Sequence, residues 1–179
     1  ATLGIVGFGR IGQALARRAL ACGMRVQACG RTPGRVRTAI AADATLGAVH
    51  ACDTLDALLA TSDVVSLHAP STRETRGMID AAALARMRPG AVLVNTARGA
   101  LVDEDALADA LAAGQLGGAG LDVHAEEPRV HPRLAAREDV VLLPHLGSAT
   151  LETRTAMGML AHANAVAWRD GAALPAPVG

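Results

Sequence analysis

The stretch "TLGIVGFGRIGQALARRALACG", residues 2–23, decides the fold of this chain. It begins with a short apolar run typical of a buried strand and continues with an Ala-rich helical run that ends near Gly23. Gly7, Gly9 and Gly12 stand between them with the spacing G-x-G-x-x-G. In this context the first glycine permits a tight turn, the second lets the backbone approach a pyrophosphate, and the third lets helix and strand pack closely. The stretch therefore predicts a dinucleotide-binding turn rather than a turn that binds nothing.

The rest of the chain repeats this alternation of apolar runs and Ala-rich stretches. We expect strands at residues 2–7, 25–29, 47–51, 63–68, 91–96, 118–123 and 140–144. Strands that are apolar throughout indicate burial on both faces, as in a parallel sheet. The sequence therefore predicts an α/β fold, a Rossmann-like doubly wound parallel sheet with helices on both faces.

Polar caps mark the starts of several helices. We expect caps at Asp53 or Thr54, at Asp80 and at Asp103, a stop at Gly114, and a long final helix over residues 151–169. These elements predict a dinucleotide-binding domain over residues 1–170 and a C-terminal tail over residues 171–179. Because the chain opens on Ala1 without an initiator Met, one residue before the first strand, we expect a domain of a longer protein.

Composition excludes several classes of function. The formal net charge is zero, so no overall field favours nucleic acid or an anionic membrane. The three cysteines are odd in number and form no C-x-x-C pair, which argues against a disulfide framework or a zinc site and favours a reducing cytosol. We predict no metal site. No signal peptide and no membrane-spanning apolar run is present in the sequence, so we expect a cytoplasmic protein without membrane contact.

The stretch "ACGRTPGRV", residues 28–36, bears on the choice of cofactor. A carboxylate at the end of the second strand would hydrogen-bond the ribose 2′-OH of NAD and repel the 2′-phosphate of NADP. Gly30 removes that repulsion, Arg31 supplies donors matched to a phosphate, and Thr32 adds a hydroxyl. An ordinary solvated loop arginine is the alternative. We expect NADP(H) to be preferred, with NAD(H) still possible.

Groups suited to acid–base chemistry leave three later strand ends. They are Arg98, then Asp122 and Glu127, and then His145. In an open parallel sheet, ligands bind beyond the carboxyl ends of strands, so these groups can converge on one crevice. An arginine can bind a carboxylate bidentately and polarise a carbonyl, and an imidazole can give up and take back a proton. Taken singly, each has an ordinary alternative: a solvated loop charge, a turn acid before Pro128, or a capping residue.

Five motifs in a fixed order point to a known family. They are "GIVGFGRIG", "DVVSLHAPSTRETRGMID", "LVNTARGALVDEDAL", "AGLDVHAEEP" and "LLPHLGSAT". With them the chain resembles the cofactor-binding domain of the D-isomer-specific 2-hydroxyacid dehydrogenases and is most similar to glyoxylate/hydroxypyruvate reductases. The resemblance implies an oxidoreductase that transfers hydride from NADPH to a small 2-oxo acid, giving the D-2-hydroxy acid. It also implies a homodimer, and an N-terminal substrate domain that this chain does not contain.

The resemblance implies a role for each site residue. Arg98 would bind the substrate carboxylate and carbonyl, His145 would be the general acid/base, and Glu127 its partner. Asp122 would lie near the nicotinamide. The predicted cofactor-binding residues are Gly7, Gly9, Arg10, Ile11, Gly12, Gly30, Arg31, Thr32, Ala69, Pro70, Thr75, Asn95, Thr96, Ala97, Asp122, Gly147 and Ser148.

Some positions depart from the family pattern or have no predicted chemical role. The segment "EPRVHPRLAARED" is laid out differently from the family's loop, and Ser71 stands where Leu is common. We expect no chemical role for His124 or His131, and a structural or cofactor-neighbour role for His68. Two alternatives stay open: a non-catalytic dinucleotide-sensing module like the family's corepressor relatives, or another dehydrogenase of the family, acting on phosphoglycerate or D-lactate.

Overall fold

The computed structural model describes residues 1–177. All seven strands form one parallel sheet within residues 1–144. The strands are β1 (Thr2–Val6), β2 (Arg25–Cys29), β3 (His50–Ala51), β4 (Val64–Leu67), β5 (Ala91–Asn95), β6 (Leu116–Leu121) and β7 (Val140–Leu142). The α-helices are α1 (Arg10–Ala21), α2 (Pro33–Ala41), α3 (Leu55–Thr61), α4 (Ala81–Arg86), α5 (Glu104–Ala112), α6 (Pro132–Ala135) and α7 (Leu151–Arg169). Two short 3₁₀ helices, η1 (Ala44–Leu46) and η2 (Gly99–Leu101), complete these elements.

The strands lie in the order β3-β2-β1-β4-β5-β6-β7, and all pairs are parallel. The chain therefore winds outward from β1 in one direction and then from β4 in the other. This order confirms the predicted Rossmann-like, doubly wound sheet. Its strand order reverses between β1 and β4, where such sheets form a ligand crevice at the carboxyl ends of the strands.

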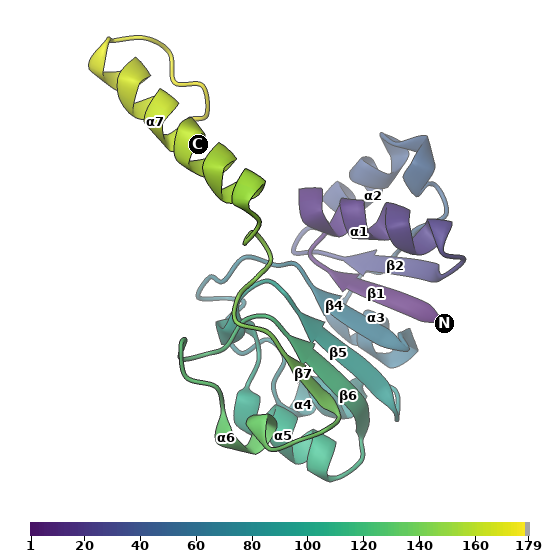
Figure 1. Ribbon diagram of the computed structural model, residues 1–179. Helices are drawn as coiled ribbons and strands as arrows, with labels where there is room; N and C mark the ends of the chain where they lie inside the picture. The colour runs from purple at the N-terminus through teal and green to yellow at the C-terminus, as the bar shows by residue number, and fades with distance from the viewer. Residues whose placement is uncertain (178–179) are drawn as a thin grey trace. The chain divides into compact units, whose positions relative to one another are not determined.

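Helices cover both faces of the sheet. In Figure 1, α1 and α2 lie on one face, whereas α3, α4 and α5 lie on the other. Two apolar clusters match these layers: one holds Ile5 and Ala16 between β1 and α1, and the other holds Leu67, Leu93 and Leu107 between the sheet and α3–α5. The core is aliphatic because the chain has only one Phe, one Trp and no Tyr.

Most predicted strands hold, and two need correction. The third strand was predicted at 47–51 and covers only His50–Ala51. The segment before it forms the 3₁₀ helix η1, because the Asp43 side chain caps this helix by accepting a hydrogen bond from the Thr45 amide. The predicted strand at 118–123 begins earlier, at Leu116, and ends at Leu121. Asp122 thus follows the strand rather than lying within it.

The predicted helix caps are confirmed, and the open choice is resolved. Thr54 rather than Asp53 caps α3, since its hydroxyl accepts from the Ala57 amide at 3.1 Å. Asp80 and Asp103 each accept from the amide three residues on, at 2.8 and 3.0 Å. Gly114 has φ 71°, the left-handed conformation that ends a helix. The final helix, α7, has the predicted bounds.

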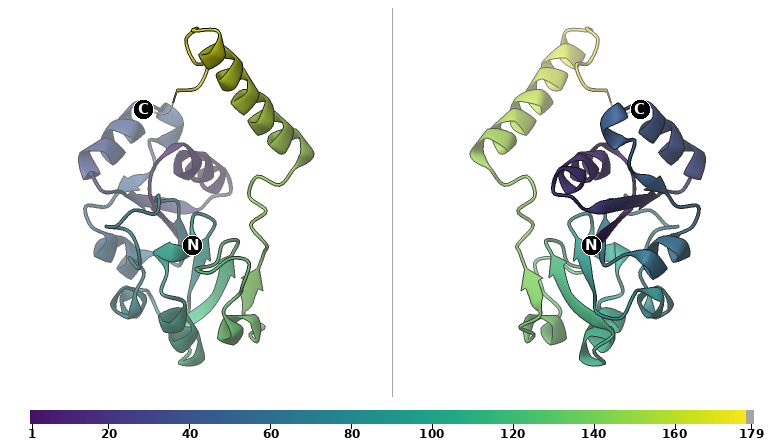
Figure 2. Two further views of the ribbon diagram at one scale, coloured as in Figure 1. Left: turned by 90° about the vertical axis from the view of Figure 1, so that its left-hand side faces the viewer. Right: turned by 90° about the vertical axis from the view of Figure 1, so that its right-hand side faces the viewer.

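Contacts within the chain divide it into two units, the first being Ala1–Pro144 and the second beginning at His145. The second unit holds α7, and the Asn164 side chain bonds both the N–H and the C=O of Ala176 at 3.0 and 3.1 Å, so the segment after the helix folds back beside it (Figure 2). The predicted domain limit at residue 170 stays a prediction. Residues 178–179 of the predicted tail lie outside the described residues. Over residues 1–177, no helix has the length and apolar character needed to cross a membrane.

Candidate functional site

The carboxyl ends of six strands line up in one row. The register pairs Cys29 with Val6, Val6 with Leu67, Leu67 with Asn95, Asn95 with Leu121, and Leu121 with Leu142. Neighbouring strands lie about 4.8 Å apart, so the loops that follow these residues leave the sheet side by side. Most of the predicted site residues of the first unit lie in these loops. The others are Asn95, the last residue of β5, and residues in the first turn of α1.

The first of these loops is the glycine turn between β1 and α1. Gly7 has φ 97°, and a Cβ there would lie 2.6 to 2.7 Å from backbone atoms of His68 and Ala69. A Cβ at Gly12 would lie 2.3 Å from the carbonyl oxygen of Gly7. Both positions therefore require glycine, for a tight turn and for close packing of helix on strand.

Gly9 differs from the other two glycines. A Cβ built there meets nothing within 4 Å, so no neighbour in the fold demands glycine. Gly9 is also the N-cap of α1, and no side chain caps the helix. The first amides of α1 therefore lie beside open space, in the first turn that holds the exposed Arg10 and Ile11. This arrangement fits a bound anion such as a pyrophosphate.

The turn after β2 carries Gly30, Arg31 and Thr32, with Arg31 and Thr32 exposed. It leads into α2, whose N-cap is Thr32, and no side chain caps this helix either. The loop after β4, two strands away in the sheet, is close enough for its charges to interact with this turn. The Glu74 carboxyl has a lowered pKa, mainly because the Thr72 side chain hydrogen-bonds to it, and the positive charge of Arg31 adds to the effect.

The loop after β4 holds Ala69, Pro70 and Thr75. The Thr75 hydroxyl donates to the Pro70 carbonyl oxygen at 2.7 Å and accepts from the Thr72 amide at 2.8 Å, so it fixes the shape of the loop. His68 bonds the Ser66 hydroxyl through Nε2 at 2.9 Å, and burial lowers the pKa of its imidazole. The choice between a structural and a cofactor-neighbour role for His68 stays a prediction.

The turn after β5 places Arg98. Asn95 is fully buried, and its side chain accepts from the Ala97 amide at 3.1 Å and donates to the Arg98 carbonyl oxygen at 2.9 Å. Thr96 and Arg98 are exposed, and Nη1 of Arg98 donates to the Ala97 carbonyl oxygen at 2.6 Å. Asn95 thus holds the turn from within, which leaves the guanidinium at the surface of the row.

The loop after β6 carries Asp122 and Glu127 and packs directly on the Arg98 turn. A Cβ at Gly99 would lie 2.0 Å from the carbonyl carbon of His124 and 2.4 Å from the Ala125 nitrogen, so only glycine allows this approach. Two carboxylates anchor the loop: Glu127 Oε1 accepts from the His124 amide at 3.1 Å, and Glu104 Oε1 accepts from the Ala125 amide at 2.9 Å.

The structure therefore brings the Arg98 turn and the loop from Asp122 to Glu127 together in the first unit. Asp122 is buried. Sequence reasoning missed Gly99 and Glu104, although both lie within the motif "LVNTARGALVDEDAL". It also assigned no chemical role to His124, which is 7 % exposed and hydrogen-bonds the Leu143 carbonyl oxygen through Nε2 at 3.1 Å.

His145, Gly147 and Ser148 belong to the second unit. His145 has φ 57°, an uncommon backbone conformation for a residue with a Cβ. The Ala149 amide donates to the Leu146 carbonyl oxygen at 3.0 Å, and the Thr150 hydroxyl caps α7 by accepting from the Thr153 amide at 3.2 Å. The meeting of His145 with Arg98 and Glu127 stays a prediction.

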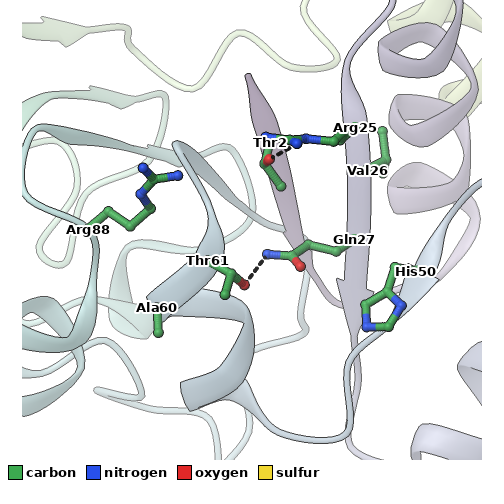
Figure 3. Close-up of a pocket in the computed structure, with 8 residues that line it drawn as sticks. All are labelled: Thr2, Arg25, Val26, Gln27, His50, Ala60, Thr61 and Arg88. Atoms are coloured by element: carbon green, nitrogen blue, oxygen red, sulfur yellow. Dashed lines mark hydrogen bonds between the residues drawn. The ribbon is translucent and has the colours of Figure 1, made fainter.

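A pocket of about 520 Å³ lies at the opposite, amino end of β1 and β2 (Figure 3). Several of its polar side chains have hydrogen-bond or ion-pair partners in the protein. The buried Gln27 amide nitrogen donates to Thr61 Oγ1 and Ser62 Oγ at 2.8 Å, and Arg88 pairs with Asp63 at 2.8 Å. We assign no ligand to this pocket. Among residues 1–177, no group of three or more His, Cys, Asp or Glu side chains could hold a metal ion.

Comparison with known proteins supplies a match for most of the chain. Residues 1–147 match the family model described as D-isomer specific 2-hydroxyacid dehydrogenase, NAD binding domain. The chain is 47% identical over 170 residues to a glyoxylate reductase of Thermococcus litoralis, covering 95% of this chain and 49% of the relative. It is 45% identical over 157 residues to a D-3-phosphoglycerate dehydrogenase of Mycobacterium bovis, covering 88% of this chain and 28% of that protein.

A solved structure agrees with these matches. The NADPH-dependent glyoxylate/hydroxypyruvate reductase of Sinorhizobium meliloti, in complex with NADP and malonate, superposes with a TM-score of 0.89 at 38% identity. The superposition covers 99% of this chain and 53% of that one. The chain thus spans about half the length of the glyoxylate reductases that it matches.

Proposed function

The chain belongs to the D-isomer specific 2-hydroxyacid dehydrogenase family through its NAD-binding domain, and we propose that it is the cofactor half of a reductase for small 2-oxo acids. The substrate would be glyoxylate, hydroxypyruvate or a similar acid, and the product the D-2-hydroxy acid. The proposal rests on one observation. The uncapped N-terminus of α1 follows β1 and the Arg98 turn follows β5, and the carboxyl ends of these strands lie in the same row of the sheet.

The glycine turn fits the pyrophosphate of a dinucleotide. The open space at Gly9 admits a ligand to the backbone, and the first amides of α1 are donors that no side chain uses. Arg31 and Thr32 fit a ribose 2′-phosphate, because both are exposed at the N-terminus of α2 and Gly30 brings no carboxylate. This arrangement supports a preference for NADPH over NADH.

When bound, the cofactor supplies a hydride to the carbonyl carbon of the 2-oxo acid. The exposed Arg98 guanidinium binds the substrate carboxylate bidentately and polarises the neighbouring carbonyl group. His145 donates a proton to the carbonyl oxygen as the alcohol forms, and takes it back in the reverse reaction. Glu127 accepts a hydrogen bond from the imidazole and so selects one tautomer. These roles for His145 and Glu127 are part of the proposal.

We extend the proposal to a cytoplasmic homodimer. Support for a dimer comes from the face of the sheet on which α1 packs. On this face, parts of β5 and β7 are left uncovered. On this face Val92 and Val94 are only half-buried and Val141 is 62% exposed. A second copy covering these valines would remove that apolar surface from water.

The test uses the full-length protein of which this domain is part. Mixing it with NADPH and each of glyoxylate, hydroxypyruvate, pyruvate and phosphohydroxypyruvate should consume NADPH with at least one acid, seen as falling absorbance. Substitution His145→Ala should nearly abolish turnover and leave NADPH affinity intact. A protein that consumes no NADPH with any acid, but changes its oligomeric state with the nucleotide, would instead be a dinucleotide sensor.

The cofactor preference has a separate test. Arg31→Ala should weaken NADPH binding far more than NADH binding. Arg37→Ala is the matched control, because Arg37 is exposed on α2 and pairs with Asp53. Equal losses for both nucleotides in Arg31→Ala would refute the assignment of Arg31 to the 2′-phosphate.

A further inference from the structure

We propose that His124 is a positioning residue for the proposed reduction, fixing both the Glu127 carboxylate and the end of the strand that leads to His145. The inference rests on the proposed function, since the reaction supplies the need for this positioning. Sequence reasoning gave His124 no chemical role. Two of its groups make hydrogen bonds to separate segments that carry the predicted acid–base pair.

The backbone of His124 holds the first segment. Its N–H donates to Glu127 Oε1 at 3.1 Å, so one oxygen of the carboxylate is fixed by the loop itself. The next amide, at Ala125, donates to Glu104 Oε1 at 2.9 Å. Because Gly99 packs on the His124 carbonyl group, the Arg98 turn lies against the same peptide.

The side chain of His124 holds the second segment. The ladder between β6 and β7 ends where the Leu143 amide donates to the Leu121 carbonyl oxygen at 2.9 Å. The Leu143 carbonyl oxygen lies 3.1 Å from His124 Nε2. Because a carbonyl oxygen only accepts, Nε2 carries the hydrogen. Both polar groups of the Leu143 backbone are therefore held by β6 and the loop after it, two residues before His145 in the chain.

The other ring nitrogen shows that packing alone does not account for a histidine here. His124 Nδ1 is buried and has no hydrogen-bond partner among the described residues. A buried polar atom left without a partner destabilises the folded state. A phenylalanine would fill a similar space without this cost. The bond from Nε2 to Leu143 is the feature that distinguishes the imidazole from an apolar ring.

The experiment compares His124→Phe and His124→Gln in the full-length protein. Phenylalanine keeps the ring and removes both nitrogens, whereas glutamine places an amide N–H near the position of Nε2. His131→Phe is the matched control: its Nδ1 is also buried without a partner, but its Nε2 bonds Asp105 on α5. The readouts are kcat and KM for the 2-oxo acid, NADPH Kd, Tm, and hydrogen exchange of the segment 140–147.

In His124→Phe we expect kcat to fall about tenfold to a hundredfold, the effect of a misplacement near 1 Å. Hydrogen exchange of residues 140–147 should speed up, while Tm does not fall and NADPH Kd is unchanged. His124→Gln should recover most of kcat, and His131→Phe should behave like the wild type.

Two results would overturn the inference. One is a His124→Phe protein with wild-type kcat and wild-type exchange. The other is a parallel loss of kcat and Tm that glutamine does not rescue, which would make His124 a structural residue only. Failure of the proposed function looks different, because the wild-type protein would then reduce no 2-oxo acid, while the exchange measurement would still report on the bond to Leu143.

Discussion

Replacing Gly99 by alanine tests how the Arg98 turn is held in place. The new Cβ would lie 2.0 Å from the carbonyl carbon of His124, 2.1 Å from its oxygen and 2.4 Å from the Ala125 nitrogen. Carbon atoms in a packed interior keep about 3.5 Å or more apart, so the two backbones must separate by about 1 Å or more. These atoms cannot rotate aside, because Glu104 and Glu127 anchor their peptides.

The separation has two measurable costs. Overpacking of this kind destabilises a fold by about 1–3 kcal/mol, and the smaller chain entropy of alanine in the unfolded state recovers only about 0.4–1 kcal/mol. A shift of about 1 Å in Arg98 relative to Glu127 should also lower kcat/KM about a hundredfold. Urea unfolding of the full-length protein measures the first effect, and steady-state reduction of a 2-oxo acid measures the second.

Gly120→Ala is the control for this substitution. Gly120 lies on β6, and the nearest atom to a Cβ there is Val94 Cγ2 at 3.9 Å, an ordinary contact. We expect near wild-type stability and kinetics. The reasoning fails if Gly99→Ala is as stable and active as the wild type, or if Gly120→Ala is equally damaged.

Three further predictions follow from the first unit. Gly9→Ala should lower Tm only slightly, by the cost of alanine at an N-cap, since nothing lies within 4 Å of the new Cβ. It should raise NADPH Kd at least tenfold by isothermal titration, about 1.4 kcal/mol. Unchanged binding would contradict a ligand at this turn. Asp43 has a pKa lowered to about 2, first by the Thr45 hydroxyl and then by Arg17, so its ion stabilises the fold above pH about 4 and this contribution is lost as pH falls toward 2. Urea titrations of Asp43→Asn between these pH values should therefore show a weaker pH dependence than the wild type, and an identical slope would count against it. Burial raises the pKa of the Cys29 thiol to about 12 and also raises the pKa of the Cys52 thiol. With iodoacetamide at pH 8, mass spectrometry should therefore show that the exposed Cys22 is labelled first. Early labelling of Cys29 would be inconsistent with its burial.

Local chemistry explains which parts of the fold could be predicted from the sequence. The glycine turn, the caps at Asp80 and Asp103 and the stop at Gly114 are decided by residues within a few positions of each other. The third strand was predicted too long, because the bond from the Thr45 amide to Asp43 favours a 3₁₀ turn at an edge strand with a single neighbour. The helix α2 was not anticipated, since Pro33 and Gly34 at its start are equally typical of a turn.

The candidate site likewise has parts that could be predicted from the sequence and parts that could not. Residues near the ends of strands, such as Arg98 and Asp122, could be found from the sequence, because apolar runs show roughly where strands end, although the predicted strand at 118–123 wrongly included Asp122. The contacts that hold these residues could not, because they join segments far apart in the chain: Gly99 to His124, Glu104 to Ala125, and His124 to Leu143. Those pairings depend on which strands become neighbours, which a single sequence leaves open.

The uncapped start of α1 makes the nucleotide part of the folding equilibrium of this domain. Without a ligand, the first turn of the helix lacks a side-chain cap, which costs about a few tenths of a kcal/mol when the N-cap residue is glycine. A bound pyrophosphate would take the place of that cap, and ligand binding at a hundred times Kd adds about 2.7 kcal/mol to the free energy of unfolding. In a cell, proteases and chaperones act on the unfolded fraction, so the supply of dinucleotide would set the lifetime of the protein as well as its occupancy.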